Sequence, residues 1–302
     1  MNYHNLPNLD ESVVRALDFF SKNKVPQFNY QDFSFPLVVG SGNAFNTAQI
    51  IFADRPAIIS HESNFQKILI AYQKLIKNKT IKRAIIISAS GEKDSIWETR
   101  LAKKSGLKTT LLTCNADSSA AKLADQVIVY KKLPEPYTYN VSTYLGIILS
   151  TSGEKAQNIK NNITKLKLSK DLKKFTSYSF ILPDEFAALA PMLEIKRNEL
   201  FGPYVSLRAF SFGEARHAKF INNSDKELVI SFGKNKYFGL KNNRWEINLP
   251  KSAGHAYVMA LSYYLIGKIQ GLKPAYFKKN IATFCKNGPR AYGQSKPFRV
   301  IV

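Results

Sequence analysis

The sequence predicts an α/β protein whose mainly parallel sheets are flanked by helices in a three-layer αβα sandwich. Two short apolar segments, 83–87 and 108–113, have the length and composition of buried strands. Between them, 94–104 has an acidic or serine cap at its start and a glycine just after its end, as expected for a helix. Strands that alternate with helices of this length are typical of parallel sheets with right-handed crossovers.

The same reasoning assigns the remaining elements. In the first half we expect helices at 10–20, 45–52, 64–77, 120–123 and 139–149, and strands at 35–40 and 127–130. In the second half we expect strands at 177–182 and 227–232, a hairpin-like pair around Phe238 and Trp245, and helices at 185–201, 213–220 and 253–270.

The length of 302 residues favours two domains. A lysine-rich stretch at 150–174 has the composition of a solvated connecting helix and separates the two groups of strands. We therefore predict an N-terminal domain at 1–153 and a C-terminal domain at 154–302, the second beginning with the linker helix.

The bulk composition limits the classes of function. The formal net charge of +22 comes from lysines scattered along the chain, without a zinc-finger, RNP or basic-zipper pattern. This charge favours anionic metabolites over a specific nucleic-acid role, which stays open as an alternative. Two distant cysteines, Cys114 and Cys285, fit a reduced, cytoplasmic protein. No secretory signal and no membrane-spanning segment is expected.

A small-residue turn follows the strand that ends at Ile87. In Ser88-Ala89-Ser90-Gly91 the hydroxyls add donors, the glycine allows close approach, and the next helix offers its free N–H groups. Ligands of parallel sheets bind at this carboxyl edge. The turn is therefore a candidate phosphate site, with an ordinary strand-to-helix turn as the alternative.

The turn and its flanks resemble the sugar-isomerase (SIS) family, which recognises phosphosugars. The resemblance covers most of 37–130 and includes Ser88–Glu92, Asn115–Asp125 and the glycine turn Gly40–Asn46. It implies two SIS-type domains, and it implies phosphate or substrate contacts for Ser41, Gly42, Asn43, Ser88, Ala89, Ser90 and Lys93. Lys93 replaces a common family hydroxyl, so it either supplies a full charge or points to solvent.

Three further substrate residues rest on the same resemblance. Glu135-Pro136-Tyr137-Thr138-Tyr139-Asn140 is similar to the sugar-lining loop in the isomerase half of glucosamine-6-phosphate synthase. That match implies that Glu135, Thr138 and Asn140 lie near the ligand. The alternative is a cap before a buried helix.

Aldose–ketose interconversion needs a carboxylate base, a ring-opening acid and a cation. By resemblance to double-SIS isomerases and the synthase, Glu199 is the base, His217 of Gly213–His217 opens the ring, and Lys279 is the cation. Glu194 and His255 are the fallback residues. The family arrangement also implies a homodimer whose active site is shared between subunits.

The sequence gives no sign of a cofactor or metal. Four histidines without HxxxH or HExxH spacing predict no metal site, and no dinucleotide or P-loop fingerprint occurs. We thus expect a cofactor-independent phosphosugar isomerase acting on glucose-, mannose- or fructose-6-phosphate. A deaminase or deglycase of an aminated sugar phosphate and a non-catalytic phosphosugar sensor are the alternatives.

Overall fold

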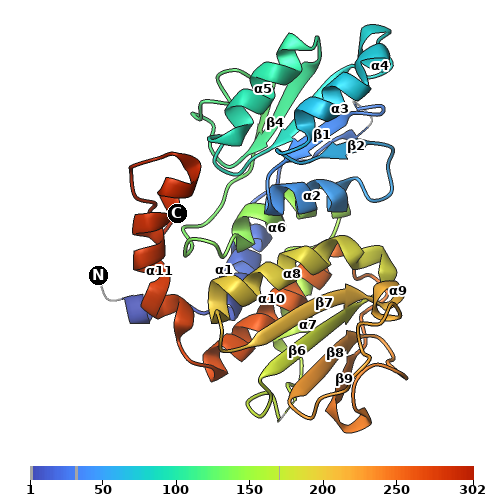
Figure 1. Cartoon of the computed structure of the whole chain (residues 1–302), viewed down its shortest axis with the longest axis vertical. Coiled ribbons are helices and arrows are strands. Elements are labelled where there is room, and N and C mark those ends of the chain that lie inside the picture. The colour runs from blue at the N-terminus through green and yellow to red at the C-terminus, as the bar shows by residue number, and fades with distance from the viewer. Residues whose placement is uncertain (1–2, 31–32, 170) are drawn as a thin grey trace. The chain divides into compact units, whose positions relative to one another are not determined.

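The computed structural model describes residues 3–30, 33–169 and 171–302. It contains two separate sheets, and every strand in each runs parallel to its neighbours (Figure 1). Helices flank both sheets, so the predicted α/β class is confirmed.

The first sheet has the strand order β2-β1-β3-β4-β5. Its strands are β1 (Leu37–Gly40), β2 (Ile58–Ser60), β3 (Arg83–Ile87), β4 (Lys108–Thr113) and β5 (Gln126–Val129). The helices that follow these strands or close this part of the chain are α2 (Asn43–Ile51), α3 (Phe65–Ala71), α4 (Gln73–Lys77), α5 (Asp94–Lys104) and α6 (Val141–Ser152). Alternate residues of each strand point to opposite faces. On one face, Leu37, Val39 and Ile86 pack with Phe65 of α3 and Ala102 of α5 in one apolar core.

The second sheet has the order β7-β6-β8-β9, with β6 at Ser177–Leu182, β7 at Ser206–Ser211, β8 at Glu227–Phe232 and β9 at Arg244–Ile247. Between β6 and β7 the chain forms the 3₁₀ helix η3 (Asp184–Leu189), helix α8 (Ala190–Lys196) and the π-helical turn η4 (Arg197–Phe201). The short helix α9 (Phe212–Ala215) follows β7 and begins with a capping box between Ser211 and Glu214.

The longest helix, α10 (His255–Leu272), is almost entirely buried. Its start is fixed by Glu154, whose carboxylate accepts hydrogen bonds from the N–H groups of Gly254, Ala256 and Tyr257, each at 2.9 Å. A carboxylate at this position satisfies orphan donors and complements the positive end of the helix. The linker stretch contains α7 (Ala156–Thr164), whose Ile159 and Ile163 are buried.

Helices α1 (Leu9–Lys22) and α11 (Tyr276–Asn287) also belong with the second sheet, α1 up to Ser21. Beyond α11 and the short helix η6 (Gly288–Tyr292), the chain returns to the segment around Pro136. Glu135 and Val302 exchange two hydrogen bonds of 3.0 Å, and Tyr137 N donates to Val300 O at 2.8 Å. The ring of Phe298 stacks on Tyr137 at 5.0 Å.

The chain divides into two compact units whose limits differ from the predicted boundary at 153. Unit 1 contains residues 1–21, 134–141 and 154–302, and unit 2 contains residues 22–133 and 142–153. The first helix and the segment around Pro136 therefore belong to the same compact unit as the C-terminal sheet, a long-range association that no local pattern reports. Within the described residues, no helix is both long and apolar enough to cross a membrane.

Several expected elements differ. Residues 120–123 form turns instead of a helix, and no hairpin forms around Phe238, because β9 joins β8 in parallel. The helix expected at 213–220 ends at Ala215. The helix expected at 64–77 is interrupted at Tyr72, and the one expected at 185–201 is a sequence of three helical types. Helix α11 was not predicted.

Candidate active site

Two loops meet at the carboxyl edge of the first sheet. Strands β1 and β3 are neighbours, and their last residues, Gly40 and Ile87, are register partners. The loop 41–42 and the turn 88–93 therefore start side by side, and Ser41 Oγ donates to Asp94 Oδ2 at 3.4 Å. The structure thus brings together the predicted substrate residues of these two loops, Ser41 to Asn43 and Ser88 to Lys93.

The turn after β3 is held by its own hydroxyls and by β4. Gly91 N donates to Ser88 Oγ at 3.2 Å and Glu92 N donates to Ser90 Oγ at 3.3 Å. Cys114 N and Thr113 Oγ1 donate to the Ala89 carbonyl at 2.9 and 3.2 Å. Because each serine oxygen accepts here, its own O–H proton remains a donor for a bound anion.

Lys93 occupies a strained backbone position at the start of α5. Its dihedrals, φ 60° and ψ −123°, nearly equal those of Gly42 at the start of α2, φ 54° and ψ −121°. Glycine adopts this conformation freely, whereas a residue with a Cβ does so at a cost of about 1–3 kcal/mol. Burial lowers the pKa of the Lys93 ammonium, and the nearby Asp94 carboxylate partly opposes that shift. A strained, partly buried cation beside Ser88 and Ser90 suits an anion site.

Gly91 has a steric requirement of its own. At φ +64°, a Cβ added to it would overlap the side chain of buried Ser118. We expect Gly91→Ala to lower the free energy of unfolding by about 2–4 kcal/mol, the sum of backbone strain and overpacking. The measurement is urea-induced unfolding of the whole chain. Gly153→Ala is the matched control, because Gly153 has φ +66° but no atom within 4 Å of the added Cβ, so only the strain remains. Equal losses for both variants would contradict the overlap.

Unit 1 contains a buried ion pair at the end of α8. The π-helical turn η4 carries Glu199, whose Oε2 lies 2.6 Å from Nζ of Lys196. The lysine side chain is 0% exposed and that of Glu199 is 14% exposed. Lys196 Nζ also donates to the carbonyls of Thr138 at 2.7 Å and Tyr139 at 3.1 Å, and it lies 5.1 Å from the ring centroid of Tyr263. Buried charges need this degree of satisfaction to be tolerated.

The segment that supplies those carbonyls is itself strained. Thr138 has φ 76° and Asn140 has φ 52°, and a positive φ in a β-branched residue is a genuine outlier. The Asn140 amide donates back to the Thr138 carbonyl at 3.2 Å, and the buried Thr138 hydroxyl has no hydrogen-bond partner among the described residues. Strain of this kind concentrates at functional sites. Glu135, in contrast, caps α6 by accepting from Val141 N at 2.9 Å.

The surroundings of Glu199 make it a stronger base than an exposed glutamate. Burial raises its pKa, and the Lys196 ammonium opposes the rise. Burial is also the main cause that raises the pKa of Tyr137 to about 12, and the Glu199 carboxylate adds a smaller contribution in the same direction. A carboxylate with a raised pKa in a partly dry site is the usual form of a general base.

His217 lies at the opposite end of β7 from Glu199, whereas Lys279 is on α11, a helix that contacts η4. Glu199 precedes the amino end of β7, and His217 follows its carboxyl end. Six residues of a strand span about 20 Å. Both Lys279 on α11 and His217 are exposed.

The two fallback residues have structural contacts. Glu194 Oε1 accepts from Ala209 N at 3.1 Å. His255 Nε2 lies 3.1 Å from the Glu185 carbonyl, and its ring packs edge-on against Phe186.

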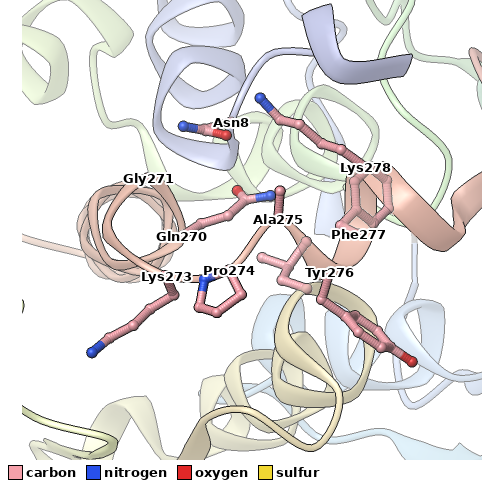
Figure 2. Close-up of a pocket in the computed structure, with 10 residues that line it drawn as sticks. Asn8, Gln270, Gly271, Lys273, Pro274, Ala275, Tyr276, Phe277 and Lys278 are labelled. Atoms are coloured by element: carbon pink, nitrogen blue, oxygen red, sulfur yellow. The ribbon is translucent and has the colours of Figure 1, made fainter. Parts of the chain in front are cut away.

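A cavity of about 130 Å³ lies between the end of α10 and the start of α11 (Figure 2). It is lined by Asn8, Leu200, Gln270, Gly271, Lys273, Pro274, Ala275, Tyr276, Phe277 and Lys278. Lys273 is engaged with the main-chain carbonyls of Lys173 and Phe175. The volume is below the roughly 300 Å³ at which small-molecule pockets begin. Leu200 alone connects the cavity with η4, so we place the candidate site at Glu199.

Lys196, the residue that organises this site, was not among the residues predicted from the sequence. Its signal was present as the spacing Lys196-x-x-Glu199, which places the two side chains on one helix face. Among 44 basic residues, however, one lysine does not stand out until its burial is known. Among the residues that the structure describes, no three or more His, Cys, Asp or Glu side chains are placed so that they could hold a metal ion.

Comparison with known proteins places the fold. No family model and no curated protein matches the chain. Among solved structures, a glucosamine-6-phosphate deaminase from Thermotoga maritima aligns with a TM-score of 0.57 at 16% identity, over 87% of this chain and 94% of its own. The chain shares the fold of this deaminase. The C-terminal domain of glucosamine-fructose-6-phosphate aminotransferase from Francisella tularensis has the same fold, with a TM-score of 0.58, 14% identity and coverage of 88% and 95%.

A tagatose-6-phosphate ketose/aldose isomerase from Escherichia coli also has this fold, with a TM-score of 0.56, 12% identity and coverage of 87% and 90%. This fold therefore carries both isomerases and deaminases of sugar phosphates. At these identities the likeness is one of architecture, and function has to be argued from the sites.

Proposed function

We propose that the chain is an enzyme that processes a phosphosugar, and that it interconverts an aldose and a ketose 6-phosphate of the glucose, mannose or fructose type. The observation that carries the proposal is the Lys196–Glu199 pair, a carboxylate with a raised pKa held by a fully buried ammonium against a strained segment. Structures that share this fold include a sugar-phosphate deaminase and a ketose/aldose isomerase.

Each part of the pair has a role in this reaction. Glu199 removes the proton from C2 of the open-chain aldose and returns it to C1, through an enediolate intermediate. Lys196 limits the rise in the pKa of Glu199 that burial causes, because the ammonium favours the charged form of the carboxylate. The turn at Ser88 and Ser90, with Lys93, binds the phosphate.

The ring-opening acid, His217, would come from a second copy of the chain. Its position beyond the carboxyl end of β7, with Glu199 before the amino end, favours a shared site over an intramolecular one. This arrangement makes a homodimer the proposed functional form. Lys279 remains the proposed cation near the enediolate, and its side chain is exposed on α11.

Deamination of an aminated sugar phosphate is the second candidate, favoured by the likeness to the Thermotoga maritima deaminase. It would use the same base, because deamination of a 2-amino sugar phosphate also requires removal of the C2 proton once the ring has opened. A non-catalytic phosphosugar sensor would bind the same ligands without this exchange.

The test combines binding with proton exchange. A thermal-shift panel of hexose and pentose phosphates identifies the preferred ligand, and NMR in heavy water then follows deuterium entry at C1 or C2. We expect stabilisation by a hexose 6-phosphate together with exchange and interconversion. Ammonia release from glucosamine 6-phosphate would select the deaminase, and binding without exchange would select the sensor. No stabilisation by any sugar phosphate would overturn the proposal.

A further inference from the structure

A group of three carboxyl side chains lies in unit 2 beside the phosphate turn. Asp94 is the first residue of α5, Glu98 follows four residues later, and Glu62 precedes α3. Glu98 is 1% exposed, and its Oε1 has no hydrogen-bond partner among the described residues. The same holds for Oε2 of Glu62. A buried carboxyl group without a donor is costly when it is ionised.

The charged groups that act on Glu98 are both negative. They are Asp94 from its own helix and Glu62 from the loop before α3, and each adds to the effect of burial. Burial, and after it these two carboxylates, raise the pKa of Glu98 to about 8. Near neutral pH this side chain is therefore a neutral acid, and it ionises only in mildly alkaline solution.

Glu98 is close enough to the turn for its charge to matter there. Four helical residues correspond to about 6 Å along the axis of α5. Between Glu98 and the turn, Asp94 accepts from Ser41 Oγ at 3.4 Å and from Trp97 Nε1 at 3.2 Å. A full negative charge appearing at Glu98 would repel an anion held by Ser88, Ser90 and the start of α5.

We propose that Glu98 couples anion binding at this turn to a proton: the turn holds phosphate while Glu98 is neutral and releases it when Glu98 ionises. This inference rests on the proposed phosphate site and adds a means of regulating it. The proton leaves to solvent, and no other group changes its covalent state.

Trp97 provides the readout. Its indole lies beside Asp94 and is 37% exposed, and the only other tryptophan in the chain is Trp245. In a Trp245→Phe background, Trp97 fluorescence can follow the binding of fructose 6-phosphate, a dianion between about pH 7 and 9, and of inorganic phosphate, whose affinity is expressed per dianion. We expect the affinity to fall about tenfold across this range in the parent protein, and to stay constant in Glu98→Gln.

Two further variants separate Glu98 from Lys93, which also loses positive charge as the pH rises. If Glu98 is responsible, Lys93→Met binds more weakly at every pH but keeps the fall. Glu62→Gln moves the fall to lower pH, because removing one carboxylate lowers the pKa of Glu98. A fall that persists in Glu98→Gln and disappears in Lys93→Met would overturn the proposal.

Failure of the proposed function gives a different result. If neither anion binds at any pH, the phosphate site and its coupling are both refuted. The protonated state of Glu98 is still measured by unfolding in urea, where the parent protein should lose stability as the pH rises from about 5 to 8 and then level off, and Glu98→Gln should not. A parallel pH dependence for the two proteins would show that Glu98 does not carry the proton.

Discussion

Replacing Glu199 with glutamine should reduce turnover of the preferred sugar phosphate by at least about 10³-fold while leaving its affinity within about twofold of the parent value. Glutamine keeps the shape of the side chain and an oxygen that can accept from Lys196, so the 2.6 Å contact has a neutral replacement. It cannot accept the C2 proton. We expect the phosphate affinity to be spared, because the proposed phosphate residues Ser88 and Ser90 lie in the turn after β3 and not in η4. Deuterium entry at C2 in heavy water, followed by NMR, measures the loss.

Glu194→Gln is the matched control for this variant. Glu194 is exposed, and it accepts a hydrogen bond from Ala209 N, a contact that glutamine can keep. We expect its turnover to remain within about threefold of the parent. Retained exchange in Glu199→Gln together with lost exchange in Glu194→Gln would transfer the role of base to Glu194.

The pH profile provides a second view of the same residue. Because burial raises the pKa of Glu199, activity should fall, as pH is lowered, at a pH above the usual glutamate range.

Mixing Glu199→Gln with His217→Ala subunits tests whether the active site is shared between subunits. One intact site should reappear in mixed dimers if His217 acts across subunits, and none if both residues act within one chain.

The central strands could be predicted from the sequence because their signal is local. The segments 83–87, 108–113, 177–182 and 227–232 agree with β3, β4, β6 and β8 residue for residue. Each is a run of mostly apolar or β-branched residues buried between helices, a pattern that few other structures tolerate. The alternation of such strands with helices was then sufficient for the parallel topology.

The errors arose where short-range and tertiary contacts compete. Residues 120–123 are too few to form a helix and are held as turns by bonds such as Ala120 N to Gly91 O. A hairpin-like pair was expected around Phe238 and Trp245, but the Asn235 side chain accepts hydrogen bonds from Tyr237 N and Phe238 N and shapes a loop. Helix α11 was overlooked although Phe277, Ile281 and Cys285 recur at helical spacing.

One part of the candidate site could be predicted from the sequence and the other could not. The turn at Ser88 could be found because a small-residue turn directly after a buried strand is visible in sequence. The environment of Glu199 could not, since it depends on Lys196 and on the carbonyls of Thr138 and Tyr139, which lie 58 and 57 residues before Lys196 in the chain. Burial, more than residue type, distinguishes Lys196 from the other lysines of the chain.

Removing the Lys196 ammonium should be among the most destabilising single changes in unit 1. Lys196→Met leaves the Glu199 carboxylate and the carbonyls of Thr138 and Tyr139 without their shared donor. Breaking a buried pair from one side costs about 3–5 kcal/mol, which we expect as the fall in the free energy of unfolding in urea. The double variant Lys196→Met/Glu199→Gln should recover part of this loss, because no uncompensated charge remains.

Lys103→Met is the control from the surface. Lys103 pairs with Asp125 at 2.7 Å, but each side chain is 42% exposed, so its loss should cost no more than about 1 kcal/mol. The deficit of Lys196→Met should also depend on pH. Without the ammonium, the pKa of Glu199 in the folded state rises further above its unfolded value, so stability is retained at low pH and lost as pH rises. Equal costs for the two lysines, or a deficit that is constant from about pH 5 to 8, would show that Lys196 does not hold a charged Glu199. The glutamate would then lose the feature that makes it a base.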